Sequence, residues 1–248
     1  KIVAMIDRLG LPDDQPISAG ILSNSIERAQ KTLEGQNFQR RKTVLMYDDV
    51  MNQQRTVIYK QRREVLDGAD LQEMISKMIT TTVAEAVESF TSAEDNSGWN
   101  LDGLRSYFLG TLCKLSDLRY TPEQIEALDR ETLIKELTEK ALALYHSKDA
   151  LFEPYGVSMR EVERIVLLRN VDTKWMEHLD AMDDLKDSVG LQSYAQRDPI
   201  NTFRLEGADM FDEMSRSIRE ETVRAILSVR PQPQMQLRRE EVAHVTGE

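Results

Sequence analysis

Apolar residues in most of this chain recur every three or four positions, which is the spacing of one face of an α-helix. Between residues 18 and 67 this apolar stripe follows Leu22, Ile26, Ala29, Leu33, Tyr47, Met51, Ile58 and Val65. The pattern predicts one continuous helix of about 50 residues, which would extend about 75 Å at 1.5 Å per residue. We expect such a helix to act as a spine against which other elements pack.

A small helical insert is predicted after the spine, over residues 68–153. Gly68 is a suitable C-terminal cap for the spine, and Asp70-Leu71-Gln72-Glu73 resembles the capped start of a helix that runs to about residue 90. A short helix is expected at 101–109. Thr121-Pro122-Glu123-Gln124 combines a capping threonine with proline at the first helical position, which predicts one further helix to about residue 146.

Residues 158–229 are predicted to form two antiparallel helices joined by a short exposed loop. A capping box at Ser158-Met159-Arg160-Glu161 starts the first helix, Gly190 is expected to end it, and Asp198-Pro199 starts the second. Residues 231–248 turn polar and rich in Pro, Gln and Arg, which predicts disorder. Because no segment alternates with the two-residue period of a strand, the predicted fold class is all-α.

Composition narrows the class of protein further. The 248 residues are 40% hydrophobic and 30% charged, with 11 glycines and 7 prolines, a balance that favours an elongated helical protein with much surface. A net charge of −11 argues against nucleic-acid binding. The single cysteine, Cys113, cannot form an internal disulfide, and we find neither a signal peptide nor an apolar run of membrane-spanning length. We therefore expect an intracellular protein, and we interpret the start at Lys1 as that of a fragment.

Candidate catalytic chemistry is sparse. The sequence has no glycine-rich phosphate loop of the usual kinds, and His146, His178 and His244 have no metal-ligand spacing. The carboxylate pairs Asp48-Asp49 and Asp183-Asp184 are neighbours on helices, so each pair diverges by about 100° rather than converging. We predict no catalytic residue, no metal ligand and no cofactor in this chain, and we interpret Cys113 as a buried small residue.

One stretch of the spine is unusually polar. Residues 36–55 place Asn, Arg, Tyr and Asp around most of the helix, with apolar residues on only part of it. Such a helix is either solvated or bound to partners through polar groups, and spacing alone does not separate these two interpretations.

The residues of this stretch also carry a resemblance. They are Gln36-Asn37-Phe38, Arg41-Lys42, Leu45, Tyr47-Asp48-Asp49-Val50, Asn52, Gln54-Arg55 and Ile58-Tyr59, followed later in the chain by Trp175, His178-Leu179, Met182-Asp183 and Tyr194-Ala195-Gln196-Arg197-Asp198-Pro199. This order resembles the scaffold helix and the two-helix finger of the SecA family, the motors of bacterial protein export. The resemblance spans essentially the whole chain and is loosest over residues 69–153.

The resemblance implies a domain organisation. Residues 1–16 would be a linker from the motor domains, 17–67 the long scaffold helix, 68–153 the helical wing, 154–230 the second scaffold part with the finger, and 231–248 the start of a C-terminal linker. The nucleotide-binding domains of the family precede this segment. ATP and Mg²⁺ would therefore belong to those domains, and this chain would not be an enzyme by itself.

The resemblance also implies binding residues and partners. Tyr47, Asp48, Asp49, Asn52 and Arg55 would face the motor domains, and Gln192, Tyr194, Ala195, Gln196 and Arg197 would contact an unfolded preprotein at the SecYEG channel. An aromatic side chain at such a tip offers contact area to many sequences. The implied location is the cytoplasm, peripheral to the cytoplasmic membrane. Contact with acidic lipids and formation of a homodimer are left open.

Function then has one leading hypothesis and two rivals. The leading hypothesis is mechanical: the scaffold couples motor movements to the finger and restrains ATP turnover. A free-standing helical adaptor that binds another protein through its long helix is the first rival. A hydrolase built on the Asp pairs is the second, and the lack of converging groups argues against it.

Overall fold

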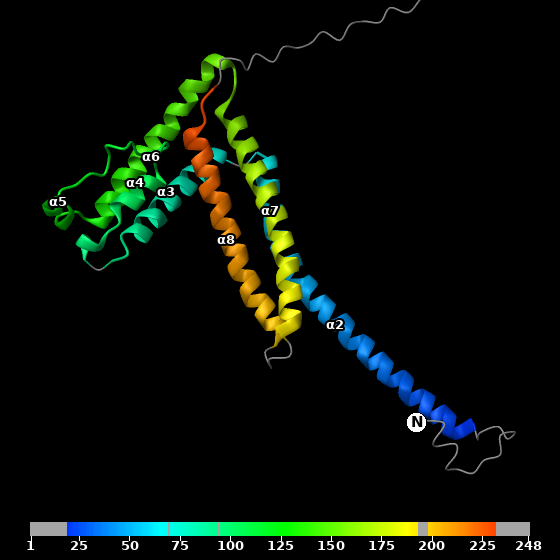
Figure 1. The fold of residues 1–248 in the computed structure, drawn as a ribbon. Helices are drawn as coiled ribbons and strands as arrows, with labels where there is room; N and C mark the ends of the chain where they lie inside the picture. The colour runs from blue at the N-terminus through cyan, green and yellow to red at the C-terminus, as the bar shows by residue number, and fades with distance from the viewer. Residues whose placement is uncertain (1–18, 69, 94, 193–197, 232–248) are drawn as a thin grey trace, which may run out of the picture. The chain divides into compact units, whose positions relative to one another are not determined.

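A computed structural model describes residues 19–68, 70–93, 95–192 and 198–231, and it is helical through most of these ranges (Figure 1). The helices in chain order are α2 (Ala19–Leu66), α3 (Leu71–Phe90), α4 (Leu101–Tyr107), α5 (Pro122–Glu126), α6 (Arg130–Phe152), α7 (Met159–Gln192) and α8 (Pro199–Ser228), with short 3₁₀ turns at Asn96–Gly98 and Glu153–Tyr155. No strand occurs within the described ranges. The predicted all-α class is confirmed.

Helix α2 is the predicted spine, and it is continuous from Ala19 to Leu66. It ends where the sequence indicates, because Gly68 adopts a left-handed backbone conformation with φ of 91° that side chains disfavour. Gly35 lies inside the helix with open space around it. The apolar stripe is buried in its second half and exposed in its first. Ile58 and Val65 are buried, whereas Ile26 and Leu33 are more than half exposed.

The predicted insert contains helices α3 to α6, and its helix starts are capped by side chains. The Asp70 carboxylate accepts from the Glu73 amide at 3.1 Å, and Thr121 and Gln124 form a reciprocal capping box. These two caps confirm the predicted starts of α3 and α5.

The helix predicted from Thr121 to about residue 146 is wrong in its continuity. The chain leaves α5 after Glu126 and begins α6 at Arg130. The Asp129 carboxylate accepts from the Thr132 amide at 2.9 Å, so Asp129 is the N-cap of a new helix rather than an interior residue. The Asn96 side chain supports the break, because it donates to the carbonyls of Ile125 and Leu128 at 3.0 and 2.8 Å.

The chain turns from α6 into α7 through a 3₁₀ turn that ends at Gly156, whose φ is 66°. Helices α7 and α8 then run antiparallel, as predicted. The direction follows from two contacts: Asn170 donates to Thr222 at 3.0 Å, whereas Met182, further along α7, lies against Gly207, nearer the start of α8. Helix α7 continues to Gln192, two residues beyond the predicted end at Gly190.

The chain divides into two units that each contain parts of α2, α7 and α8. Unit 1 comprises Lys1–Gln53 and Lys186–Leu205, and unit 2 comprises Gln54–Leu185 and Glu206–Glu248. Unit 2 holds two apolar cores. The first core joins the insert to the start of α7 and the end of α8, around Ile79, Leu104 and Ile226. The second core joins α2, α7 and α8 around Ile58, Trp175 and Ile218. Trp175 is buried in the second of these cores.

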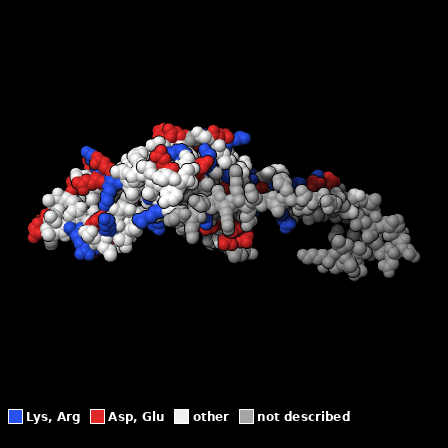
Figure 2. All heavy atoms as spheres, turned by 90° about the horizontal axis from the view of Figure 1, so that it is seen from above, with Lys and Arg blue, Asp and Glu red and all other residues white. Residues whose placement is uncertain are grey.

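The surface carries both signs of charge in close mixture. On the face drawn in Figure 2, lysine and arginine side chains are interspersed with aspartate and glutamate. Many ion pairs involve exposed side chains, such as Lys31 with Glu27 at 2.7 Å, and pairs of this kind contribute little net stability. Among the helices that the structure describes, none is both long and apolar enough to cross a membrane.

Candidate functional site

The five residues of α2 that are predicted to face the motor domains differ in their exposure. Asp48, Asp49, Asn52 and Arg55 are exposed, as a surface that binds a partner requires. Tyr47 is only 8% exposed, because its side chain turns toward other elements of unit 1. The four exposed residues therefore remain candidates for a partner surface, whereas Tyr47 contacts this chain itself.

Tyr47 packs against the start of α8 and the end of α7. Its ring lies edge-on to Phe203 with 4.7 Å between centroids, and the Lys186 ammonium is 5.7 Å from the Tyr47 centroid. Burial, and secondarily the negative charge of Asp198, raise the pKa of Tyr47. Tyr47 thus stays protonated at neutral pH and joins the three helices within unit 1.

The residues of the predicted fingertip lie between α7 and α8 in the sequence. Tyr194, Ala195, Gln196 and Arg197 lie outside the described residues. Gln192 is the last residue of α7, and its side chain also lies outside the described part of the structure. The contact of these five residues with a preprotein stays a prediction.

A buried polar joint connects α2, α7 and α8 inside unit 2. The Gln54 amide nitrogen donates to the Gly207 carbonyl at 2.8 Å, and the Gln54 amide oxygen lies 2.9 Å from Nε2 of His178. Gln54 is 8% exposed and His178 is 4% exposed. One side chain of α2 therefore binds both helices of the predicted finger, and we call Gln54, His178 and Gly207 the joint.

The joint defines the hydrogen-bonding state of His178. An amide oxygen can only accept, so Nε2 of His178 carries the proton and donates to Gln54. The imidazole lies between two aromatic rings, with centroid distances of 5.7 Å to Trp175 and 5.8 Å to Phe211. Burial lowers the pKa of His178, which favours the neutral ring at physiological pH.

Gly207 allows the backbone of α8 to come close to its neighbours. A Cβ atom at this position would lie 2.7 Å from Cε and 3.2 Å from Sδ of Met182. Met182 is almost fully buried, so the space beside Gly207 is already filled. The absence of a side chain at Gly207 therefore suits the close packing of α7 and α8 at the joint.

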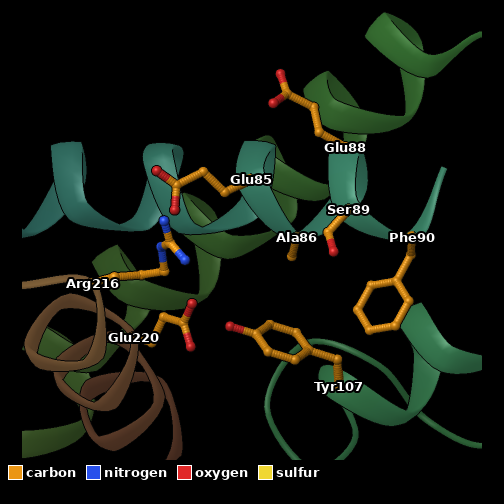
Figure 3. A pocket seen from close by; sticks show the side chains of 8 residues that line it. All are labelled: Glu85, Ala86, Glu88, Ser89, Phe90, Tyr107, Arg216 and Glu220. Carbon is orange, nitrogen blue, oxygen red and sulfur yellow. The ribbon is translucent and has the colours of Figure 1, made fainter. Parts of the chain in front are cut away.

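A pocket of about 620 Å³ lies in unit 2 between the insert and α8 (Figure 3). Glu85, Glu88 and Phe90 come from α3, Tyr107 from α4, and Arg216 and Glu220 from α8. In Figure 3 the Tyr107 hydroxyl points toward the Glu220 carboxylate. Burial, followed by the charge of Glu220, raises the pKa of Tyr107.

Internal ion pairs account for much of the polarity of this pocket. Arg219 forms an ion pair with Glu85, and the Arg224 guanidinium lies 5.6 Å from the centroid of Tyr107. The pocket therefore resembles a polar seam between α3, α4 and α8 more than a reaction centre. Its lining contains no nucleophile with a base and an orienting group.

The remaining candidate groups do not gather into a reactive site. Asp183 and Asp184 are exposed on α7, and Cys113 is buried with a raised pKa, mainly because of desolvation. Among the residues that the structure describes, no three His, Cys, Asp or Glu side chains are grouped to hold a metal ion. The arrangement of the described residues suits binding and mechanical support.

Comparison with known proteins decides the family. A family profile described as the SecA Wing and Scaffold domain matches residues 16–230. This chain belongs to the SecA family. Similar proteins include protein translocase subunit SecA 1 of Alkaliphilus metalliredigens, with 42% identity over 95% of this chain, and protein translocase subunit SecA of Clostridium beijerinckii, with 44% identity over 93%. The SecA subunit of Clostridium perfringens is 40% identical over the full chain.

The match covers only part of each SecA relative. This chain spans 26% of the Alkaliphilus and Clostridium beijerinckii proteins and 29% of the Clostridium perfringens protein. The matched part is the wing and scaffold region, in agreement with the predicted insert, spine and helix pair. The helix ends fall close to the expected domain boundaries, which themselves remain predictions.

Sequence reasoning did not identify the joint in this SecA segment. Gln54 and His178 belong to longer sequence motifs that do not indicate a bond between them, and Gly207 belongs to none of these motifs. A signal was present, because Gln54 lies four residues before Ile58 on the face of α2 that unit 2 buries. A polar residue on an apolar stripe indicates a buried hydrogen-bonding partner.

Proposed function

We propose that this chain is the mechanical scaffold of a SecA protein translocase subunit. In this role it passes movements of the nucleotide-binding domains to a two-helix finger that contacts an unfolded preprotein at the SecYEG channel. The chain itself binds no nucleotide and catalyses no reaction; ATP and Mg²⁺ belong to the motor domains. Its working location is the cytoplasmic surface of the membrane.

One observation carries this proposal, namely the contrast between the two halves of α2. Every residue from 23 to 45 is exposed in this chain, including Ile26, Leu33 and Phe38, each more than half exposed. Ile26 and Leu33 lie on one face of the helix, and exposed apolar side chains of this kind are typical of a surface that another domain covers. Ile58 and Val65, by contrast, are buried against α7 and α8.

This contrast suits force transmission. A helix that presents one half to a partner and packs the other half into its own chain connects the two physically. The exposed Asp48, Asp49, Asn52 and Arg55 add charged and amide groups beside the apolar stripe, so they can fix the register of the partner. Restraint of ATP turnover would follow if the motor domains must displace α2 in order to move.

The test is a mixing experiment with separately produced SecA motor domains, in which binding and ATP turnover are recorded. We expect binding, and a lower turnover when the chain is added. The double variant Asp48→Arg and Asp49→Arg should weaken binding. A matched control is Asp183→Arg with Asp184→Arg, because it reverses an equally exposed adjacent pair on α7.

The outcome separates the candidate functions. Absence of binding at micromolar concentration, with the chain folded by circular dichroism, would contradict the scaffold role and favour a free-standing helical adaptor. The finger is tested separately, in the whole translocase subunit that carries this segment. There, Tyr194→Ala should impair preprotein transport while leaving the thermal unfolding midpoint unchanged, and unimpaired transport would exclude a role for this side chain.

A further inference from the structure

The side chain of Gln54 binds one helix through each end of its amide group. The Gln54 oxygen accepts from His178 on α7, and the Gln54 nitrogen donates to the backbone of Gly207 on α8. Both bonds are buried. The partners lie 124 and 153 residues away in the sequence, so neither bond contributes to the local stability of α2.

The position of the joint along the chain is as informative as its chemistry. The boundary between the two units falls after Gln53 on α2, after Leu185 on α7 and after Leu205 on α8. Gln54 and Gly207 are thus the first and second residues of unit 2 on their helices. The joint therefore holds α2 and α8 at the first residues of unit 2 on each helix, and it binds α7 at His178 within the same unit.

Apolar contact alone is available at more than one axial position of the helices. Ile58, Trp175 and Met214 belong to a core in which apolar side chains recur along α7, at Leu167, Val171 and Trp175. A shift of one turn, about 5.4 Å, would therefore replace one apolar contact by another. The same shift would break both bonds of Gln54 and leave buried polar groups unpaired, which is strongly unfavourable.

We propose that Gln54, His178 and Gly207 act as a register lock, which fixes the axial position of the α7–α8 pair along α2. The Gly207 carbonyl accepts from the Gln54 amide nitrogen, and Met182 fills the space beside Gly207. His178 donates to the Gln54 amide oxygen. All three are positioning residues. The lock rests on the proposed function only in one respect: a fixed register matters for transport if α2 passes movement to the helix pair.

Spin-label distance measurements on the full 248-residue chain test the lock directly. Labels are placed at Tyr59→Cys on α2 and Ser228→Cys on α8, two exposed positions within unit 2 that lie far apart along the helix axes, in a Cys113→Ser background. The unchanged joint should give one narrow distance distribution. Gln54→Met, which keeps side-chain length and helix propensity, should add a second distance shifted by about 5 Å, the rise of one turn.

A matched pair at His178 separates the lost hydrogen bond from altered packing. His178→Gln retains a donor for the Gln54 oxygen and should keep the single narrow distribution, whereas His178→Leu removes the donor and should broaden it. This pair also keeps the test decisive if Gln54→Met fails to fold. A single narrow distribution in both Gln54→Met and His178→Leu would overturn the lock.

Transport in the whole subunit distinguishes failure of the lock from failure of the proposed function. With the lock broken, preprotein transported per ATP hydrolysed should fall several-fold in Gln54→Met and recover in His178→Gln relative to His178→Leu. A second distance without any change in this ratio would support the lock and contradict the mechanical role. An unchanged distance distribution overturns the lock whatever the transport result.

Discussion

At the scale of single residues, Glu163 has the most fully buried charged side chain in the described part of the structure. Its side chain is fully buried, and one carboxylate oxygen accepts from the Tyr145 hydroxyl at 2.6 Å and pairs with Arg160 at 2.8 Å. Its other oxygen has no hydrogen-bond partner in the structure. Burial raises the pKa of Glu163, and the nearby charges of Asp149 and Asp70 act in the same direction. Ionised Glu163 is therefore costly despite its partners.

Glu163→Gln should change how stability depends on pH. A carboxyl whose pKa is raised by folding binds more protons in the folded state, so its contribution to stability falls as pH rises above the unfolded value of about 4.5. Glutamine does not ionise, so the variant does not lose stability in this way as pH rises. We expect its free energy of unfolding, relative to the unaltered chain, to increase between pH 4.5 and pH 7 in urea titrations. A constant difference across this range would contradict the pKa shift.

His178 has the opposite sign of pH dependence. Its pKa is lowered by folding, so the unfolded state binds the extra proton and stability falls as pH drops below about 6.5. Charged neighbours in the groove beside it are Lys174 and Glu177 on α7 and Asp209 and Glu213 on α8. His178→Gln should remove part of the loss between pH 7.5 and 5.5, measured by urea unfolding. An identical pH profile in the variant would show that His178 does not titrate in this range.

At the scale of elements, local signals predicted most helix ends, and distant contacts explain the failures. Gly68, Asp70 and Thr121 act within three residues of the ends they define, so the sequence displays their roles directly. The break between α5 and α6 depends also on Asn96, which lies about 30 residues earlier in the chain and whose amide donates to carbonyls at the end of α5. The hydrophobic periodicity of the sequence does not reveal a bond between residues so far apart.

The same distinction applies to the candidate sites. Asp48, Asp49 and Arg55 could be predicted as surface because they lie in a stretch that is polar on most faces. The burial of Tyr47 depends on Phe203, which lies more than 150 residues later, so the sequence could not separate Tyr47 from its polar neighbours. The joint was missed for the same reason, since each of its bonds connects residues more than 120 positions apart.

The cap of α3 gives a quantitative prediction at this scale. Asp70→Ala removes the acceptor of the Glu73 amide and should lower the free energy of unfolding by about 1 kcal/mol. Asp67→Ala is the matched control, because Asp67 is also exposed and lies before the cap; it should change stability by less than about 0.5 kcal/mol. Chemical denaturation measures both values. Equal effects of the two variants would exclude a capping role for Asp70.

At the scale of the whole molecule, the chain is a SecA wing and scaffold segment in which residues 23–45, about half of its longest helix, are exposed. Its insert and helix pair bury their own cores, so unit 2 has the internal packing of a stable domain. Residues 23–45 of α2 have no such packing in this chain. Helices draw most of their stability from tertiary contacts, so this half should depend on the remainder of the translocase subunit.

Backbone amide hydrogen exchange along α2 tests this dependence most directly. It should be measured in this chain alone and in the whole SecA subunit that contains it. The scaffold account predicts that residues 23–45 exchange rapidly in the isolated chain and become strongly protected in the whole subunit, while the segment from Ile58 to Val65 is protected in both. Equal exchange of residues 23–45 in the two proteins would contradict the claim that α2 is the element through which motor and finger are connected.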